Sequence, residues 1–366
     1  MVLRRYLRKN EIMESLFNFT LEELQTTLSL SKNFVAKQVW NWLYCCGVKS
    51  FDEMTNISKQ LRQKLVEQYS IKRPFILKDL TSIDGTRKWL VKLNDGEKIE
   101  IVYIPEEDRG TLCISTQAGC GMGCRFCSTG SQGLTRNLEV FEIVWEIILA
   151  RDCLDEWKNI SKGIGNGRKI TNIVLMGMGE PLNNYDNVVK ALKIINDENG
   201  MAFSNRRITL STCGIAPKIY DLARDIKINL AISLHAATDE IRKKIMPIAE
   251  SFSIDEIMKA CSVYAKSTNY RRITFEYIMI KDINDSIAEA EKLVKLVKKY
   301  NVPAKFNLIP FNYWVGCTFK EPSDIKKIMR FAAYITNARY PCPIRLSKGG
   351  DIMAACGQLK TSTRDF

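Results

Sequence analysis

Apolar residues recur at helical spacing through the first part of the chain, which predicts a helical domain over residues 1–85. Thr20-Leu-Glu-Glu is a capping box and opens the first helix of this region. A second helix is expected from about residue 33 to residue 46, where Gly47 is placed to end it. A third helix begins near Ser58. We therefore expect a small helical accessory domain, separate from the rest of the chain.

The spacing of the apolar residues then changes from helical to alternating, which is the pattern of β-strands. Residues 88–93 and 98–103 flank an Asp95-Gly96 turn, so we expect residues 86–110 to form a β-hairpin that links the two main parts of the chain. The apolar side chains of its second strand share one face, which sends Glu100 to the opposite face.

Further along the chain, short apolar strands alternate with helical stretches, a pattern typical of a parallel sheet. Helical patterns follow the strands, for example at residues 140–150, 286–299 and 323–338. The expected fold class is α/β, with an incomplete (β/α)6 barrel over residues 111–345 and a loop and tail over residues 346–366. Active sites of such folds lie at the carboxyl ends of the strands. The predicted strands span residues 112–117, 172–177, 208–212, 228–233, 273–280 and 305–309.

The composition is that of an ordinary globular protein, with 366 residues of which 46% are hydrophobic and 26% charged. The chain has no run of about 18 or more apolar residues, the length that a membrane span requires. Its basic start is followed by Glu11 and Glu14 instead of the apolar core of a secretory signal. We therefore expect a cytoplasmic protein with no membrane partner.

The formal net charge of +13 favours an acidic partner, and nucleic acid is the commonest one. Compositional drift is the alternative explanation, because the chain is rich in Lys, Ile and Asn. The stretch Gly163–Lys169 lacks the spacing of a phosphate-binding loop, and we expect a basic surface loop there that can contact RNA.

The cysteines provide the strongest chemical signal. Cys120, Cys124 and Cys127 form a C-x3-C-x2-C motif directly after the first predicted barrel strand. Three thiolates in one loop can bind three irons of a [4Fe–4S] cluster and leave the fourth iron open. That iron can chelate the amino and carboxylate groups of S-adenosylmethionine (SAM) and deliver an electron to its sulfonium. A structural zinc ion is the alternative, but it requires a fourth ligand nearby, and the sole histidine, His235, lies more than 100 residues away.

A glycine-rich motif, Met176-Gly-Met-Gly179-Glu180-Pro, stands at the end of the second predicted barrel strand. Its glycines, Gly179 among them, allow the backbone to approach a ligand closely, and Glu180 can accept hydrogen bonds from an ammonium group. Beside a cysteine triad, this motif predicts the site for the amino group of SAM. Read alone, it could equally be an ordinary turn between a strand and a helix.

The next two predicted strands also end in polar residues. Ser211-Thr-Cys-Gly follows one strand, and Ser233-Leu234-His235-Ala follows the other. These motifs present hydroxyl groups and an imidazole at the same edge, so we expect Ser211, Ser233, Leu234 and His235 to contact the cofactor. A histidine at the end of a strand can also be a satisfied structural residue.

Two more cysteines are candidates for chemistry. Gly349-Gly-Asp-Ile-Met-Ala-Ala-Cys356-Gly describes a flexible loop that presents a thiol. Cys113 lies within the first barrel strand, seven residues before the cysteine triad. Taken alone, Cys113 is expected to be a buried packing residue.

Together these motifs closely resemble the RlmN/Cfr family of radical-SAM RNA adenosine methyltransferases, and the resemblance covers nearly the whole chain. It implies that Asn312, in Asn307-Leu-Ile-Pro-Phe-Asn312, contacts SAM. Many relatives read Ser-Thr-Ser-Gly where this chain has Ser211-Thr-Cys213-Gly; the serine that is matched to SAM remains. The shared motifs include Tyr103-Ile-Pro-Glu, Thr111-Leu-Cys-Ile-Ser, the cysteine triad, Gly177-Met-Gly-Glu-Pro-Leu, Ser233-Leu-His-Ala and Ala354-Ala-Cys-Gly-Gln-Leu.

The resemblance implies a mechanism that uses two SAM molecules per turnover. Carbon 2 of adenine is electron-poor, so it cannot attack a methyl sulfonium in the ordinary way. Cys356 is implied to take a methyl group from one SAM, and a radical from the second SAM then abstracts hydrogen from that S-methyl group. The carbon radical adds to the base, Glu100 is implied to be the general base, and Cys113 releases the product by forming a disulfide with Cys356.

The resemblance also implies the partners. It implies methylation of an adenosine in the peptidyl-transferase region of 23S rRNA and in the anticodon loop of tRNA, with the accessory domain helping to hold RNA. An electron donor such as flavodoxin or ferredoxin is implied, and we expect a monomer. The target base must be exposed from structured RNA before it can reach a buried radical.

Three alternative functions account for part of the sequence. A Cfr-type enzyme would methylate carbon 8 of adenine with the same thiol chemistry. A methylthiotransferase would need a second cluster domain before the triad, where residues 1–100 offer only the adjacent Cys45 and Cys46. A basic RNA-binding protein with a structural metal would have no use for the glycine–glutamate and serine–histidine motifs.

Overall fold

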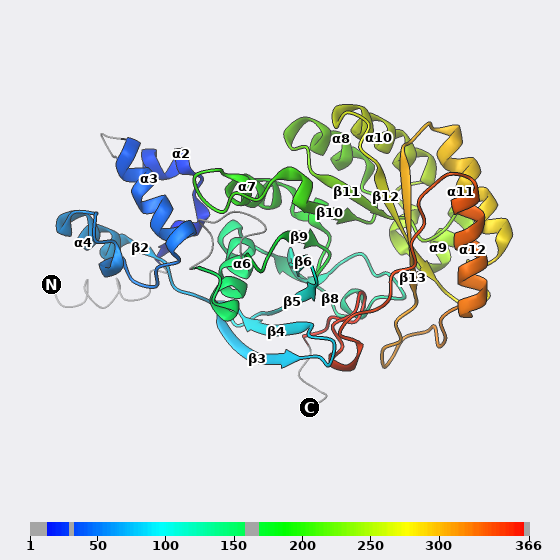
Figure 1. Ribbon diagram of the computed structural model, residues 1–366, viewed down its shortest axis with the longest axis horizontal. Helices are drawn as coiled ribbons and strands as arrows, with labels where there is room; N and C mark the ends of the chain where they lie inside the picture. The colour runs from blue at the N-terminus through cyan, green and yellow to red at the C-terminus, as the bar shows by residue number, and fades with distance from the viewer. Residues whose placement is uncertain (1–12, 29–32, 158–167, 362–366) are drawn as a thin grey trace. The chain divides into compact units, whose positions relative to one another are not determined.

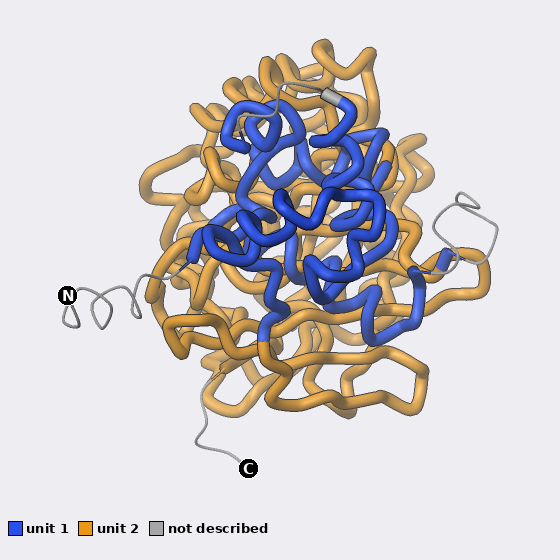
Figure 2. Tube along the Cα trace, turned by 90° about the vertical axis from the view of Figure 1, so that its left-hand side faces the viewer, with its two compact units in different colours: residues 1–74, 139–168, 190–202 blue, residues 75–138, 169–189, 203–366 orange. Residues whose placement is uncertain are grey.

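The structure is a computed structural model that describes residues 13–28, 33–157 and 168–361 (Figure 1). The basic start of the chain and residues 163–167 of the glycine-rich stretch lie outside the described residues. The chain divides into two compact units, coloured separately in Figure 2. Unit 1 comprises residues 1–74, 139–168 and 190–202, and unit 2 comprises residues 75–138, 169–189 and 203–366.

Unit 1 contains the three predicted helices. Thr20 caps α2 (Leu21–Thr27), and the capping box with Glu23 is present. Helix α3 (Asn33–Asn41) continues into the π-helical turn η3 (Trp42–Cys46), which ends at Gly47 in the left-handed conformation, with φ of 67°. Ser58 caps α4 (Lys59–Gln68). The unit also contains a pair of short parallel strands and two short 3-10 helices: β1 (Glu14–Ser15), β2 (Tyr69–Ser70), η2 (Leu16–Asn18) and η4 (Phe51–Glu53).

The most buried helix of unit 1 is α6 (Val140–Leu154), in which every residue from Val140 to Arg151 is buried, Glu142 and Glu146 included. Just beyond its end, Glu156 lies between two buried arginines: its Oε1 is 3.5 Å from Arg151 Nε and 3.7 Å from Arg168 Nε. Arg168 is therefore a core residue, which corrects the prediction of a surface loop for this residue, whereas Lys169 is exposed as expected.

Unit 2 is built on a nine-stranded sheet with the order β13-β12-β11-β10-β9-β6-β5-β4-β3. The run from β6 to β13 is parallel, and β5, β4 and β3 extend it as antiparallel strands. Among the described residues β13 does not pair with β3, so the barrel is incomplete, as predicted. The strands are β3 (Phe75–Thr81), β4 (Arg87–Lys92), β5 (Lys98–Glu106), β6 (Arg109–Cys113), β9 (Asn172–Leu175), β10 (Ile208–Thr212), β11 (Asn229–Ser233), β12 (Ile273–Met279) and β13 (Ala304–Pro310).

Strand β3 was not predicted, because its sequence falls in the region that was assigned to helices. Its burial alternates between exposed and half-buried positions, as at an edge strand. The neighbouring hairpin of β4 and β5 is confirmed, with Asp95-Gly96 in its turn. The helices and smaller elements of unit 2 are β7 (Gln117–Cys120), α5 (Ser128–Ser131), β8 (Gly133–Asn137), η6 (Pro181–Asn184), η7 (Asn205–Arg207), α8 (Ala216–Asp225), α9 (Asp239–Ile245), η8 (Pro247–Glu250), α10 (Ile254–Ser267), α11 (Ile287–Lys299), α12 (Ile325–Asn337) and η9 (Gly350–Ile352), and α7 (Tyr185–Asn196) belongs to both units.

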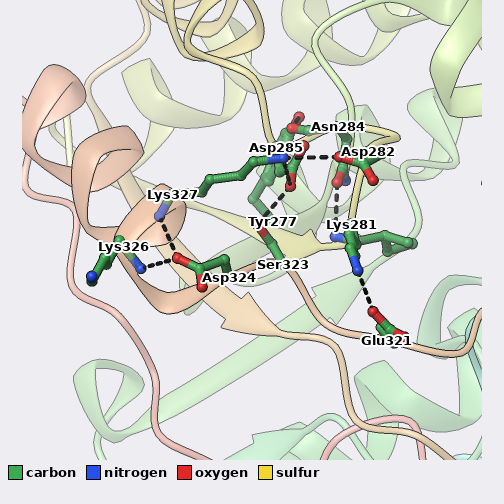
Figure 3. A network of polar contacts seen from close by, with 11 residues as sticks. Tyr277, Lys281, Asp282, Asn284, Asp285, Glu321, Ser323, Asp324, Lys326 and Lys327 are labelled. Carbon is green, nitrogen blue, oxygen red and sulfur yellow. Dashed lines mark hydrogen bonds and ion pairs between the residues drawn. The ribbon is translucent and has the colours of Figure 1, made fainter.

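The outer side of the sheet packs against helices. Tyr277 of β12 stacks at 5.3 Å on Phe331 of α12. Figure 3 shows the polar network at the start of α12: Lys327 binds Asp282 at 2.9 Å and Asp285 at 3.5 Å, in the turn between β12 and α11. Ser323 donates to Asp285 at 2.6 Å. This network fixes the last strand–helix unit of the barrel.

The strand register defines the inner face. Cys113 lies opposite Val102 and Val174, so these residues share a face, and Glu100 joins them two positions before Val102. The same alternation carries this face across the remaining parallel strands. Its polar members there are Thr209, Ser211, Asn229, Ser233, Thr274, Glu276, Lys305 and Asn307. No helix in the described part of the chain is both long and apolar enough to cross a membrane.

The carboxylate shared by two buried arginines generates a stability prediction. Glu156→Gln removes a carboxylate that lies within 4 Å of two buried guanidinium groups, and we expect a loss of about 3–5 kcal/mol in the free energy of unfolding. Urea denaturation of the full chain measures the loss. Glu198→Gln, at an exposed position of the same unit, is the matched control and should change stability by less than about 0.5 kcal/mol. An equal loss for the two variants would contradict the proposed role of the ion pair.

Candidate active site

The cysteine triad lies in a compact loop between β7 and α5. Cys127 N donates to Cys124 O at 3.0 Å, and Cys127 is the residue immediately before α5. Burial raises the pKa of all three thiols, to about 12 for Cys120. The thiols also raise one another's pKa, because each would be a negative charge near the others.

This donor set fits an iron–sulfur cluster. In the described residues no group of three or more Cys, His, Asp or Glu side chains converges as a single metal ion requires. A cubane has a different requirement, because each of its cysteines binds a different iron. Thiols whose pKa is raised by burial and mutual repulsion need the positive charge of bound iron to ionise. The residues that would hold the cluster are Cys120, Cys124 and Cys127.

The glycine-rich loop after β9 packs directly on the strand that leads to the cysteine triad. Gly179 has φ of 103°, and a Cβ there would lie 2.6 Å from Gln117 Cβ, so a side chain is excluded. Glu180 is buried, and its two oxygens accept hydrogen bonds from Leu182 N at 3.0 Å and Cys213 N at 2.8 Å. Burial raises the pKa of Glu180. Glu180 therefore joins the loops after β9 and β10.

Cys213 lies in the loop after β10 and is buried. Its Sγ lies 3.4 Å from Met122 Sδ, inside the cysteine triad. Burial raises the pKa of the Cys213 thiol well above its ordinary value, and the Glu180 carboxylate raises it further. Cys213 is therefore a neutral contact between the loop after β10 and the cluster loop.

Ser211 and Ser233 both lie on the inner face of the sheet, near the carboxyl ends of β10 and β11. Within the described residues neither hydroxyl has a protein hydrogen-bond partner, although both residues are half-buried. Leu234 is fully buried, so only its backbone is available to a ligand. The two hydroxyls are thus the polar groups that this face offers to a bound molecule.

His235 is held in a single orientation. It adopts the left-handed conformation with φ of 58°, and its Nδ1 accepts a hydrogen bond from Ile278 N at 3.0 Å. Its ring meets the ring of Phe126 edge to face at 4.8 Å. Burial lowers the pKa of His235 to about 3, so the imidazole is neutral and carries its proton on Nε2.

The loop that carries Cys356 is bound to the cluster loop. Ser128 N donates to Gly357 O at 2.7 Å, and Thr129 Oγ1 donates to Leu359 O at 2.7 Å. Asn312 Nδ2 donates to Cys356 O at 3.1 Å, so the side chain of Asn312 is engaged with this loop. Burial raises the pKa of the Cys356 thiol to about 11, although part of the residue remains exposed.

The other end of this loop is attached to the turn between β3 and β4. Ser82 Oγ donates to Asp351 at 2.5 Å, and Gly349 N donates to Asp84 at 3.0 Å. Gly349 is left-handed, with φ of 62°, and a Cβ there would lie 2.8 Å from Thr86 Cγ2. The Cys356 loop is therefore held at both ends by residues far away in the sequence.

Glu100 lies at the centre of these contacts. Its Oε1 is 2.8 Å from Lys88 Nζ, and its Oε2 accepts a hydrogen bond from Lys360 N at 2.7 Å. Lys88 Nζ also donates to Met353 O at 3.1 Å. Burial raises the pKa of Glu100, and the ammonium group of Lys88 partly offsets this effect. Cys113 shares the face of Glu100, and all twelve cysteines are reduced.

Two residues of this site were missed by the sequence analysis. Lys88 alternates onto the buried side of β4, a position that the hairpin pattern could have revealed as an unusual place for a lysine. Arg242, on α9, is fully buried beside the loops after β10 and β11, and no sequence signal marks it. A cavity of about 520 Å³ bordered by α11 and α12 includes none of the predicted site residues.

Comparisons with known proteins agree with this geometry. Residues 114–297 match the family model described as "Radical SAM superfamily", and residues 15–71 match the "Ribosomal RNA large subunit methyltransferase N-terminal domain". A "Dual-specificity RNA methyltransferase RlmN" from Zymomonas mobilis is 49% identical over 356 residues, covering 97% of this chain and 88% of its own. A protein of the same name from Paramagnetospirillum magneticum is 51% identical over 335 residues, 91% of this chain and 72% of its own. The crystal structure of a radical SAM methyltransferase from Sphaerobacter thermophilus matches with a TM-score of 0.87 and 38% identity, over 95% of this chain and 99% of that one.

The cysteine triad generates a metal-binding prediction. Anaerobically reconstituted protein should bind about four irons and four sulfides per chain, as a cubane requires. Replacing Cys120, Cys124 and Cys127 by Ala should abolish iron binding, measured by iron and sulfide analysis. Cys46→Ala removes an exposed thiol and serves as the control, with full iron content expected. Full iron content in the triple variant would show that these residues are not the ligands.

Proposed function

The chain belongs to the RlmN family of radical SAM methyltransferases, and from that premise we propose that it methylates carbon 2 of an adenosine in RNA through a methyl group carried on Cys356. Membership of this family means that the chain binds a [4Fe–4S] cluster and SAM. The cluster, when bound, supplies the electron that generates a radical from SAM, which abstracts hydrogen from the methyl group on Cys356.

The observation that carries this proposal is the attachment of the Cys356 loop to two other parts of the site. The loop binds the cluster loop through Ser128 and Thr129, and its backbone at Lys360 binds Glu100. A methyl group on Cys356 would therefore lie near both the source of the radical and the group proposed to remove a proton from the base. A thiol with a packing role only would need no such connection.

Several features support RNA as the substrate. The relatives are named dual-specificity RNA methyltransferases, and residues 15–71 match the N-terminal domain of a ribosomal RNA methyltransferase family. The net charge of +13 suits a polyanion. We propose adenosines of 23S rRNA and tRNA as targets, with residues 1–85 as the domain that helps to hold RNA.

The proposed reaction requires an electron donor and a reducing environment. The cluster requires a low-potential electron donor such as flavodoxin or ferredoxin. Cys113 and Cys356 must return to the thiol state after each turnover, which suits the reducing cytoplasm. We propose that residues 86–110 are a hairpin extension, residues 111–345 the barrel and residues 346–366 the loop and tail that carry the methyl group, in a monomeric enzyme.

The residues of the inner face have separate tasks in this proposal. Glu180, Ser211, Ser233, His235 and Asn312 bind and orient SAM. Gly179 and Leu234 contribute backbone, because neither offers a polar side chain. Since the imidazole of His235 is neutral, it can donate one hydrogen bond from Nε2 without adding charge near the cluster.

Glu100 and Cys113 complete the reaction. After the carbon radical on Cys356 has bonded to carbon 2, the adduct must give up one electron, which the bound cluster would take back, and Glu100 accepts the proton from carbon 2, with Lys88 at 2.8 Å favouring its carboxylate form. Cys113 thiolate then attacks the sulfur of Cys356. A sulfur–sulfur bond forms, the carbon–sulfur bond breaks, and its electron pair goes to the carbon on the base, which takes up a proton to become the methyl group. A cellular thiol must reduce the resulting disulfide.

The two thiols generate the sharpest prediction. Purified protein should carry an extra methyl mass on the peptide that contains Cys356, and Cys356→Ala should lose that mass and all RNA methylation while keeping its iron. Cys113→Ala should still load Cys356 and attack the base, but no thiolate can release the product. Protein and RNA should therefore accumulate as a covalent adduct, seen as a gel shift that survives denaturant and disappears with ribonuclease.

Cys261→Ala is the control for this experiment, because Cys261 is buried in α10 and lies outside the proposed machinery. It should form 2-methyladenosine as the unchanged protein does, measured by nucleoside mass analysis. Normal turnover of Cys113→Ala would overturn the two-cysteine mechanism. Formation of 8-methyladenosine would instead assign the chain to carbon-8 chemistry.

The ion pair between Lys88 and Glu100 generates a prediction about pH. The ammonium group favours the carboxylate form of Glu100, so Lys88→Met should raise the pKa of Glu100 further. The acidic limb of the single-turnover methylation rate should then move to higher pH. Lys88→Arg keeps the charge and should restore the profile. An unshifted limb in Lys88→Met would mean that Glu100 is not the base or that Lys88 does not control its ionisation.

A further inference from the structure

Arg242 is a fully buried cation, and no carboxylate of the described residues lies within ion-pair distance of it. It lies on α9, and its side chain is 0% exposed. Its guanidinium donates only to backbone carbonyls: Nε to Leu234 O at 3.2 Å, Nη1 to Phe252 O at 3.3 Å, and Nη2 to Cys213 O and, at 3.5 Å, Ser233 O. Asp239, three residues earlier on the same helix, acts on this guanidinium only at longer range, and its carboxylate accepts a hydrogen bond from Ile254 N at 2.8 Å.

Arg151, the other arginine of the described chain that is 0% exposed, shows how a buried guanidinium charge can be balanced by a carboxylate. Arg151 is also 0% exposed, but a buried carboxylate, that of Glu156, lies 3.5 Å from its Nε. Removing a guanidinium from water costs several kcal/mol, and carbonyl dipoles offset only part of this cost. A buried cation that lacks an anion in the protein is expected where a bound group supplies the anion.

The contacts of Arg242 place it beside the cysteine triad. The carbonyl of Cys213 accepts from Arg242, and the Sγ of the same residue is 3.4 Å from Met122 in the triad loop. On the other side of the triad loop, Arg125 N donates to Ile245 O at 3.0 Å, one helical turn beyond Arg242 on α9.

We propose that Arg242 is the buried counter-charge of the iron–sulfur cluster and makes the cluster easier to reduce. Three thiolates outweigh the charge of the oxidised cubane core, so the bound cluster is an anion, and reduction adds another negative charge. A fixed cation in a region of low dielectric stabilises the reduced form more than the oxidised one. The proposal rests on the assignment of Cys120, Cys124 and Cys127 as the ligands.

The same contacts give Arg242 a positioning role toward SAM. The carbonyls that it binds belong to Cys213, Ser233 and Leu234, which follow β10 and β11 directly. Ser233 and Leu234 are among the residues proposed to bind SAM. The Arg242 side chain thus holds the loops after β10 and β11 together. Variants that change its charge can be compared with variants that change its contacts.

The test is the reduction potential of the cluster in the reconstituted full chain without SAM, measured by a redox titration that is followed by electron paramagnetic resonance. Arg242→Gln removes the charge, and the equilibrium constant for one-electron reduction should fall at least about tenfold, a shift of about 59 mV to lower potential. Arg242→Lys keeps the charge, and its constant should stay within about threefold of the unchanged protein.

Lys244→Gln is the matched control, because it removes a cation from the same helix at a side chain that is 63% exposed, where water screens the charge. Its potential should not change. An unchanged potential in Arg242→Gln with full iron content would overturn the proposal, and so would an equal shift in Arg242→Lys, because the contacts and not the charge would then be responsible.

Misfolding of the variant and a wrong ligand assignment can both be distinguished from a failure of the proposal. Where circular dichroism shows that Arg242→Gln does not fold, citrulline at position 242 replaces it, since citrulline is neutral but keeps the shape and most of the donors of arginine. The same fall in potential is expected, and its absence overturns the proposal. A wrong assignment of the ligands appears separately, as iron content that does not depend on the cysteine triad.

Discussion

The parallel run of the sheet is the constraint on which the site depends. Strands that run in one direction bring their carboxyl ends to one edge, and the loops after β6, β9, β10 and β11 therefore meet although they are far apart in the sequence. Hydrogen bonds across this edge join the loops to one another, as Glu180 joins the loop after β9 to Cys213 after β10. The sheet thus supplies the positions, and the loops supply the chemistry.

The antiparallel strands β3, β4 and β5 serve a different purpose. They provide the attachment points for the Cys356 loop: Ser82 and Asp84 in the turn between β3 and β4, Lys88 on β4 and Glu100 on β5. Each contact joins residues that are more than 250 positions apart in the chain. Strands β3, β4 and β5 are therefore part of the candidate site and do more than extend the sheet.

Most of the fold could be predicted because its signals are local. Thr20, Gly47 and Ser58 mark helix ends through their own backbone preferences, and the apolar runs of the parallel strands are read from their length and spacing. Strand β3 could not be predicted in this way, because its edge position leaves alternate residues exposed and weakens the apolar pattern. The site was predicted where residues cluster in sequence, as in the cysteine triad. Lys88 and Arg242 owe their importance to burial, which no single local pattern reports, so they became visible only in three dimensions.

The two thiols of the proposed reaction differ in how far they can move. Cys113 belongs to a strand that is paired on both sides, to β5 and to β9, so its position is set by the interior of the sheet. Cys356 lies in a loop that is held by individual hydrogen bonds. In each catalytic cycle the two sulfur atoms must come together and then separate. We expect the Cys356 loop to make this movement, while Cys113 stays in place in the sheet. The hydrogen bonds that hold this loop, at Ser128, Thr129 and Asn312, are the contacts that such a movement would break and re-form.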